Sequence, residues 1–285
     1  MATWRPDPSF YPSPRMAAKA PKETLAYVAA FDPDRKRPDA IAVVDVDPAS
    51  STYSQIVGQV EMPNVGDELH HFGWNACSSC LCPNAPHPHV ERRYLVVPGL
   101  RSSRLHIIDT KPDPRNPKIV RVIEPAEIAE KANYSRLHTT HCGPEGIYVN
   151  ALADRDGKAP GGIFLLDHQS FDVLGQWEMD RGPQKLAYDF WWHLGHDTMI
   201  TSEWPQMVEI SRDGKRVYFT NSLYGAIDPQ FYPEGIDGWM VKLDVADGGG
   251  IAFDERFFVD WPKGHRPHQV RLEGGDCSSD SYCYP

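Results

Sequence analysis

One recurring phrase constrains the fold of this chain more than any other feature. An apolar run ends in an aspartate four times, with spacings of 64, 58 and 77 residues, at Asp45, Asp109, Asp167 and Asp244. The first three aspartates precede a polar turn and a further strand-like segment, which covers residues 54–60, 118–123 and 172–177 respectively. An aspartate at such a position accepts hydrogen bonds from the backbone of the turn that follows it. The pattern therefore indicates repeated units of short strands.

Irregular repeats of this size are typical of four-stranded blades with insertions, which predicts an all-β chain folded as a β-propeller. The 26 prolines and 22 glycines agree with many turns. We expect one propeller domain over residues 1–285, with residues 1–22 as an extended arm. Helices are expected only at 125–133 and within 15–31. The alternative, in which an apolar pair before aspartate is merely a common strand end, stays open from the pattern alone.

The composition of the chain restricts the classes of partner that we expect it to bind. The formal net charge is −10 and the isoelectric point is near 5.6, which argues against nucleic acid because phosphate binding needs a positive field. No stretch approaches the roughly 18 apolar residues of a membrane-spanning helix. The N-terminus lacks the apolar core of a signal peptide. We expect a cytoplasmic protein, or a periplasmic one if an export signal has been removed. The oligomeric state is not determined by the sequence.

Histidines are concentrated in a few short motifs. Those that we take as candidate metal ligands are His70, His71, His138, His141 and His268. The inner strands of a propeller converge on a central channel, so imidazoles from different blades can surround one ion. Imidazole suits copper, zinc, iron and nickel, and no carboxylate cluster accompanies these residues. A transition metal is therefore favoured over calcium or magnesium, although each His-x-x-His taken alone is more often a structural pair.

Three of the six cysteines fall within six residues, at Cys77, Cys80 and Cys82. They are compatible with zinc binding, completed by His87 and His89 because structural zinc takes four ligands. They are equally compatible with a redox or thiol-binding pair at Cys77 and Cys80, or with a buried reduced pair. The chain has no Gly-x-Ser-x-Gly nucleophile motif and no glycine-rich phosphate loop.

These residues belong to a longer pattern that resembles the selenium-binding protein family, whose members include methanethiol oxidases. The most specific stretch is Asp67–Cys80, which contains His-His-Phe-Gly-Trp-Asn-Ala-Cys-Ser-Ser-Cys. Further matching stretches follow in family order: 97–104, 122–125, 137–142, 161–167, 188–191, 202–204, 205–207, 213–216 and 274–280. The resemblance covers nearly the whole chain and implies a propeller that has seven blades in the family.

The chain departs from that pattern in two places. The match jumps at Trp204–Pro205, where about three middle blades of the family are skipped. The skipped region includes an Asn-Trp-x-His-Gly element whose histidine is a metal-ligand candidate in relatives. Ser54 stands where animal relatives carry a cysteine discussed for selenium binding, so the family name does not by itself define the activity of this chain.

The resemblance implies a copper-dependent thiol oxidase that converts methanethiol, O2 and water to formaldehyde, hydrogen sulfide and hydrogen peroxide. It implies the five histidines above as the ligand pool, with Asp67 or Glu68 orienting a ligand imidazole. Cys77 and Cys80 would relay electrons or hold a sulfur species. One alternative is a carrier that binds selenium or a soft metal through its cysteines without turnover. Another is an interaction scaffold in which the histidines are incidental.

Overall fold

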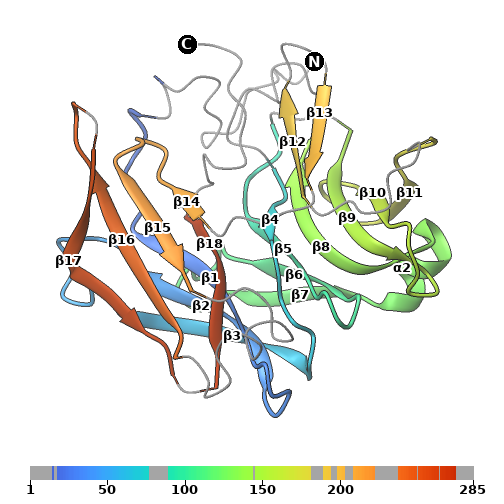
Figure 1. Ribbon diagram of the computed structural model, residues 1–285, viewed down its shortest axis with the longest axis horizontal. Helices are drawn as coiled ribbons and strands as arrows, with labels where there is room; N and C mark the ends of the chain where they lie inside the picture. Colours follow the sequence, from blue (N-terminus) through green and yellow to red (C-terminus); the bar gives the residue numbers. More distant parts are fainter. Residues whose placement is uncertain are drawn as a thin grey trace.

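The computed structural model describes residues 15, 18–76, 89–143, 145–180, 189–193, 198–202, 208–221, 237–248, 250–262 and 264–273. Within 189–193 and 198–202 it describes the backbone and the side chain of Phe190. The described residues form four antiparallel four-stranded sheets, a two-stranded sheet and one short helix (Figure 1). The chain is thus a β-propeller, as predicted. Among the described residues, no helix is long and apolar enough to cross a membrane.

We name the four-stranded sheets blades A to D. Blade A combines the last strand of the chain with the first three, in the order β18 (Arg266–Leu272), β1 (Leu25–Phe31), β2 (Pro38–Asp45) and β3 (Ile56–Val65). Blade B has the order β4 (Gly73–Trp74), β5 (Tyr94–Pro98), β6 (Leu105–Asp109) and β7 (Lys118–Ile123).

The other two blades follow the same order of strands. Blade C comprises β8 (Tyr134–Cys142), β9 (Ile147–Asp154), β10 (Gly162–Leu166) and β11 (Val173–Gln176). Blade D comprises β14 (Val208–Ile210), β15 (Arg216–Thr220), β16 (Trp239–Val245) and β17 (Ile251–Asp260). Between them in sequence, β12 (Asp189–His193) pairs with β13 (Thr198–Ser202).

The first strand of each blade faces the first strand of a neighbour. β4 lies against β8, and β14 lies against β18. Three apolar cores then fill the spaces between blades: one joins D to A, one joins A to B and one joins B to C. We call β18, β4, β8 and β14 the inner strands, since they bring distant parts of the sequence to one region.

The aspartate repeat marks equivalent positions, as predicted. Asp45 and Asp109 end the third strands of blades A and B, and Asp167 directly follows the third strand of blade C. Asp244 is the next-to-last residue of β16, the third strand of blade D. Oδ1 of Asp167 accepts hydrogen bonds from the backbone N–H groups of Gln169 and Ser170, at 2.9 and 2.7 Å. These bonds hold the pKa of Asp167 below its usual value, because they stabilise the charged carboxylate.

The two helix predictions had different outcomes. Helix α2 (Pro125–Ala132) is present where the sequence predicted a helix and has a proline in its first turn. It ends at Asn133, which has a left-handed conformation. The second prediction was a short helix within 15–31: Arg15 is helical, whereas residues 25–31 form strand β1. This alanine-rich run is buried on both faces, with Ala26 in the core toward blade D and Tyr27 in the core toward blade B. Packing on two sides therefore overrides helix propensity here.

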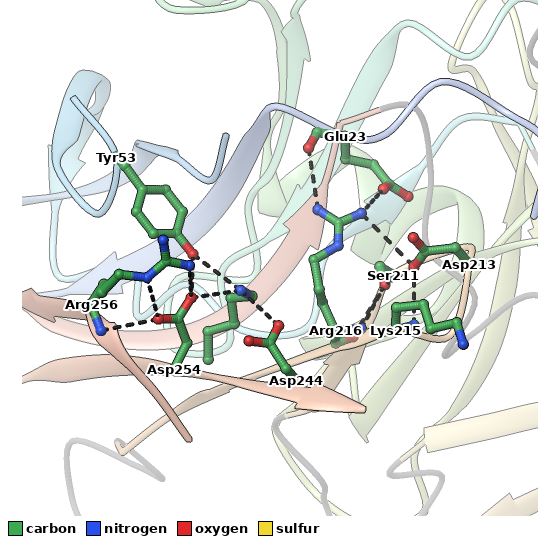
Figure 2. Close-up of polar contacts among 10 residues, drawn as sticks. Glu23, Tyr53, Ser211, Asp213, Lys215, Arg216, Asp244, Asp254 and Arg256 are labelled. Carbon is green, nitrogen blue, oxygen red and sulfur yellow. Dashed lines mark hydrogen bonds and ion pairs between the residues drawn. The ribbon is translucent and has the colours of Figure 1, made fainter. Parts of the chain in front are cut away.

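Two buried polar contacts join blades A and D (Figure 2): one is a hydrogen bond from an ion pair inside blade D, and the other is an ion pair between the two blades. Lys242 of β16 donates to Asp254 of β17 at 2.8 Å and to the Tyr53 hydroxyl of blade A at 3.1 Å. Glu23, just before β1, accepts from the guanidinium groups of Arg216 at 2.5 Å and Arg212 at 2.9 Å. We refer to the first set, Tyr53, Lys242 and Asp254, as the Lys242 network.

The remaining domain-level predictions concern residues outside those described. The Trp204–Pro205 junction and most of the 1–22 arm fall there. A hairpin follows the junction: β14 and β15 are joined by a turn in which Gly214 N–H donates to the Ser211 carbonyl at 2.8 Å. Gly214 has a φ of +67°, a conformation that glycine adopts without steric cost.

Candidate metal centre

Four of the five candidate histidines meet where the inner strands converge. His70 and His71 lie just before β4, His138 lies on β8, and His268 lies on β18. All four side chains belong to residues at most 1% exposed. The blade order thus brings together residues that are almost 200 positions apart in the sequence.

Backbone hydrogen bonds hold the histidine segments side by side. The N–H of His71 donates to the carbonyl of His138 at 3.1 Å, and the N–H of Thr140 donates to the carbonyl of His71 at 2.9 Å. Asp39 of β2 accepts from the N–H of Leu69 at 3.1 Å, which attaches the same segment to blade A. The histidine positions are therefore set by three blades, and not by a flexible loop.

The imidazole rings are in mutual contact. The ring centroid of His70 lies 4.3 Å from that of His268 and 4.8 Å from that of His138. The ring centroid of His71 lies 4.8 Å from that of His138 and 5.0 Å from that of His268. One nitrogen from each of His70, His71 and His138 can be chosen so that all three lie within 4.8 Å of one another. Metal–nitrogen bonds are about 2.0–2.1 Å long, so small ring movements would place these donors on one ion.

Electrostatics favour the neutral, metal-binding form of these rings. Burial lowers the pKa of His70 well below its ordinary value, and the neighbouring imidazoles of His268, His138 and His71 lower it further. The pKa of His71 is lowered in the same way, first by burial and then by His138 and His268. A metal needs a neutral imidazole with a free lone pair, so this donor set fits a transition-metal ion.

His141, the fifth candidate, has a different environment. Its ring packs edge-on against Phe190 of β12, with centroids 4.9 Å apart. It is buried and lowers the pKa of His71 through its charge. His141 thus borders the four-histidine cluster from the side of blade C and lies outside the three-nitrogen group.

The two candidate carboxylates face different histidines. Oε1 of Glu68 lies 3.8 Å from Nε2 of His70, and the same carboxylate pairs with Arg101. Asp67 accepts a hydrogen bond from Arg104 at 3.2 Å and lies 3.6 Å from Nε2 of His106. Glu68 is therefore the carboxylate placed to act on a cluster imidazole, whereas Asp67 acts on a buried histidine that the sequence analysis did not single out.

Sequence reasoning also missed three buried polar residues behind His71. Gln269 and Arg271 lie on β18, and Glu209 lies on β14; all are at most 3% exposed. The available signal was the alternation of a strand, since Gln269 and Arg271 share one face. The partner from β14 could not be found from the sequence because it depends on how blades A and D meet.

The cysteine predictions remain largely outside the structure. Cys77, Cys80, Cys82 and the accompanying His87 lie outside the described residues. Cys142 is buried at the end of β8, and its Sγ lies 3.5 Å from Nε2 of His168. This thiol–imidazole pair is in blade C, immediately after His141 in the sequence.

Comparison with known proteins supports the family suggested by the motifs. The family model described as 56kDa selenium binding protein matches residues 4–204 and 205–283. Selenium-binding protein 3 of Arabidopsis thaliana is 38% identical over 251 residues, which are 87% of this chain and 51% of that protein. Human methanethiol oxidase is 41% identical over 207 residues, which are 72% of this chain and 43% of that protein.

A solved structure agrees with both fold and family. The X-ray structure of a hypothetical selenium-binding protein from Sulfolobus tokodaii is 39% identical, with a TM-score of 0.89, and the alignment covers 98% of this chain and 100% of that chain. The present chain spans about half the length of the curated relatives it matches. On the family model and on these identities, the chain belongs to the 56kDa selenium binding protein family.

Proposed function

We propose that this chain is a copper-dependent thiol oxidase that converts methanethiol, O2 and water to formaldehyde, hydrogen sulfide and hydrogen peroxide. The observation that carries the proposal is the cluster of four buried imidazoles on the inner strands of blades A, B and C. Methanethiol oxidases of cattle, frog and human, at 41–42% identity, supply the reaction class.

The chemistry divides between the metal and the chain. Copper bound here would lower the pKa of a thiol and exchange electrons with O2. The residues that would hold the copper ion are His70, His71, His138 and His268. His141, which borders them, is a further candidate ligand. Their burial excludes bulk water from the reacting thiol, and their neutrality leaves the lone pairs for the metal.

Acidic residues beside the cluster position its rings. Glu68 lies within reach of His70 and is itself held by Arg101, which suits it to fix the ring of His70. Cys77 and Cys80, which follow the histidine segment directly in the sequence, are proposed to relay electrons or to hold a sulfur species released by the reaction.

Copper content and methanethiol turnover test this function together. The protein, loaded with copper and freed of excess metal, is expected to hold about one copper per chain and to consume methanethiol and O2 with formation of hydrogen peroxide. His138→Ala is expected to lose both properties. His265→Ala is the matched control, because His265 contacts the carbonyl of Pro38 outside the cluster. Full copper content and turnover in His138→Ala would refute the assignment.

A carrier that binds selenium without turnover is the second candidate, favoured by the names of the plant and mouse relatives. It predicts selenite binding that survives loss of the histidines and fails when Cys77 and Cys80 are replaced by serine. Selenite binding in Cys77→Ser/Cys80→Ser equal to wild type would reject this candidate.

The Trp204–Pro205 junction bears on which protein performs the reaction. The two stretches matched by the family model meet at this junction, and we infer that about three blades of the family pattern are absent between them. Intact-mass measurement on protein purified from its natural source decides this point. A mass near 32.1 kDa supports a shortened propeller, whereas a much larger mass means that the working protein contains a middle segment.

A further inference from the structure

A buried polar chain approaches the histidine cluster from behind His71. Arg271 of β18 donates from Nη1 to Oε2 of Glu209 at 2.9 Å and from Nε to the carbonyl of Phe72 at 3.0 Å. Oε1 of Glu209 also accepts from the N–H of Leu272 at 3.1 Å. The guanidinium of Arg271 is thus fixed by groups from blades A, B and D.

The fixed guanidinium determines how the neighbouring amide is oriented. Arg271 offers only donors, so the carbonyl oxygen of Gln269 faces it, at 2.7 Å from both Nη1 and Nη2. The amide nitrogen of Gln269 then lies 2.9 Å from Nδ1 of His71 and donates to it. The orientation is assigned from this hydrogen-bond network, in which the reverse orientation would oppose two donors.

The amide in turn determines where His71 carries its proton. A nitrogen that accepts a hydrogen bond has its lone pair occupied, and a neutral imidazole that accepts at Nδ1 bears its proton on Nε2. For the usual metal-ligating histidine the arrangement is opposite: Nδ1–H donates to a carboxylate or carbonyl, and the lone pair of Nε2 binds the metal. His71 is therefore held in the tautomer that does not coordinate through Nε2.

We propose that Gln269 is a positioning residue that sets His71 apart from the other cluster histidines and makes it the weakest metal ligand. His70, His138 and His268 would then serve as the permanent ligands of the metal, and the position that His71 would otherwise take would stay available for the small thiol. Three protein ligands with one open position are the usual design of a catalytic metal site. This inference rests on the proposed copper function for its role, although the tautomer of His71 can be measured without metal.

Gln269→Glu is the decisive variant because it keeps the size of the side chain and replaces the donating amide with a carboxylate. A carboxylate accepts from Arg271 and from Nδ1–H of His71 at the same time. In metal-free protein, the imidazole ¹⁵N shifts of His71 in long-range ¹H–¹⁵N spectra are expected to change from the Nε2–H to the Nδ1–H pattern. The dissociation constant for Cu²⁺, measured by competition with a chelator, is expected to fall at least tenfold, in line with the effect of carboxylates behind ligand histidines.

Gln269→Met and Gln176→Glu complete the series. Gln269→Met removes the donor without adding charge, so it is expected to release His71 into a mixture of tautomers with a smaller gain in copper affinity. Gln176→Glu adds the same charge on the exposed edge strand β11 and is expected to leave both readings unchanged. A wild-type spectrum with the proton of His71 on Nδ1, or unchanged spectra and affinity in both Gln269 variants, would overturn the inference.

Copper binding and the tautomer of His71 are measured independently, so the positioning role of Gln269 and the copper oxidase function can fail separately. If wild-type protein binds no copper while the tautomer of His71 switches in Gln269→Glu, the copper oxidase function is wrong and the action of Gln269 on His71 stands. If copper binds and turns over but the tautomer does not respond to Gln269, the function stands and the positioning role is wrong.

Discussion

Two buried polar clusters lie on different strands of the propeller and differ in composition. The histidine cluster on the inner strands brings together neutral bases whose pKa values are lowered by burial and by one another. The Lys242 network between blades A and D joins opposite charges (Figure 2). There, burial opposes ionisation, but bonds from Lys242 and Arg256 outweigh it and hold the pKa of Asp254 below its usual range.

The difference indicates what each cluster is for. A buried charge pair with its hydrogen bonds made is complete, and removal of one partner leaves the other uncompensated. The four imidazoles are all bases, and the carboxylate of Glu68 lies 3.8 Å from one of them, His70. The cluster is therefore not built from paired opposite charges. The Lys242 network is therefore a structural link, whereas the donor set of the histidine cluster fits a metal ion.

The largest effect is expected from His70→Ala, which removes an imidazole that contacts both His138 and His268. We expect copper affinity to fall more than 100-fold, because loss of a ligand exceeds the 10–100-fold effect of losing a group behind one. Thermal unfolding of the metal-free variant should still be cooperative. Competition with a chelator gives the affinity, and unchanged copper binding would show that the cluster is structural after all.

Lys242→Met tests the structural role of the Lys242 network. It leaves the buried carboxylate of Asp254 with Arg256 as its remaining ionic partner and the Tyr53 hydroxyl as a neutral one, and we expect the free energy of unfolding to fall by about 3 kcal/mol. Copper affinity should be unchanged. Lys215→Met is the control, since its ion pair with Asp247 is exposed to solvent and screened by it. Equal losses in the two variants, measured by urea unfolding, would contradict the structural role of Lys242.

Acid should affect the two clusters in different pH ranges. Because the pKa values of His70 and His71 are lowered in the folded protein, the unfolded chain binds more protons below about pH 6.5, and stability falls as the pH drops. Each imidazole should contribute about 1.4 kcal/mol per pH unit. The lowered pKa of Asp254 gives a loss only below about pH 4.

Urea unfolding of metal-free protein at pH 7.5, 6.5 and 5.5 measures this dependence. The loss of unfolding free energy between pH 6.5 and 5.5 should be smaller in His70→Ala by about 1 kcal/mol, because an unfolded imidazole with a pKa of about 6.5 is only half protonated at pH 6.5. It should be unchanged in Lys242→Met. An equal pH dependence of the unfolding free energy in wild type and His70→Ala would mean that His70 binds protons as readily in the folded protein as in the unfolded chain. Its pKa would then not be lowered by folding.

The smallest expected effect is that of Tyr53→Phe, which removes one neutral group from the Lys242 network. The Tyr53 hydroxyl donates to Asp254 at 2.9 Å and accepts from Lys242 at 3.1 Å, and its loss should cost about 1 kcal/mol of unfolding free energy. The ionic pair itself remains, so copper affinity and the pH slope should match wild type. A loss as large as in Lys242→Met would show that the hydroxyl, and not the charge pair, is the essential link.

Much of the fold and part of the site could be predicted from the sequence. The aspartate phrase reports a local event, the end of a third strand and the turn after it, and Asp45, Asp109 and Asp167 occupy equivalent places in three blades. Helix α2 followed from its own end signals. The histidine motifs were found because imidazoles so placed are chemically conspicuous and because the surrounding motif resembles a known family. These features depend on neighbours in the sequence, which is why sequence alone determined them.

Other features were decided only when the blades packed. The run at 25–31 is a strand because its two faces enter two different cores, a long-range fact that outweighs its alanine content. Which carboxylate faces which imidazole, and the meeting of Glu209, Arg271 and Gln269 behind His71, depend on β14, β18 and the segment before β4 converging. Hydrogen bonds and burial act over a few ångströms in space, and the sequence specifies the residue types while the tertiary structure specifies which of them are within that reach.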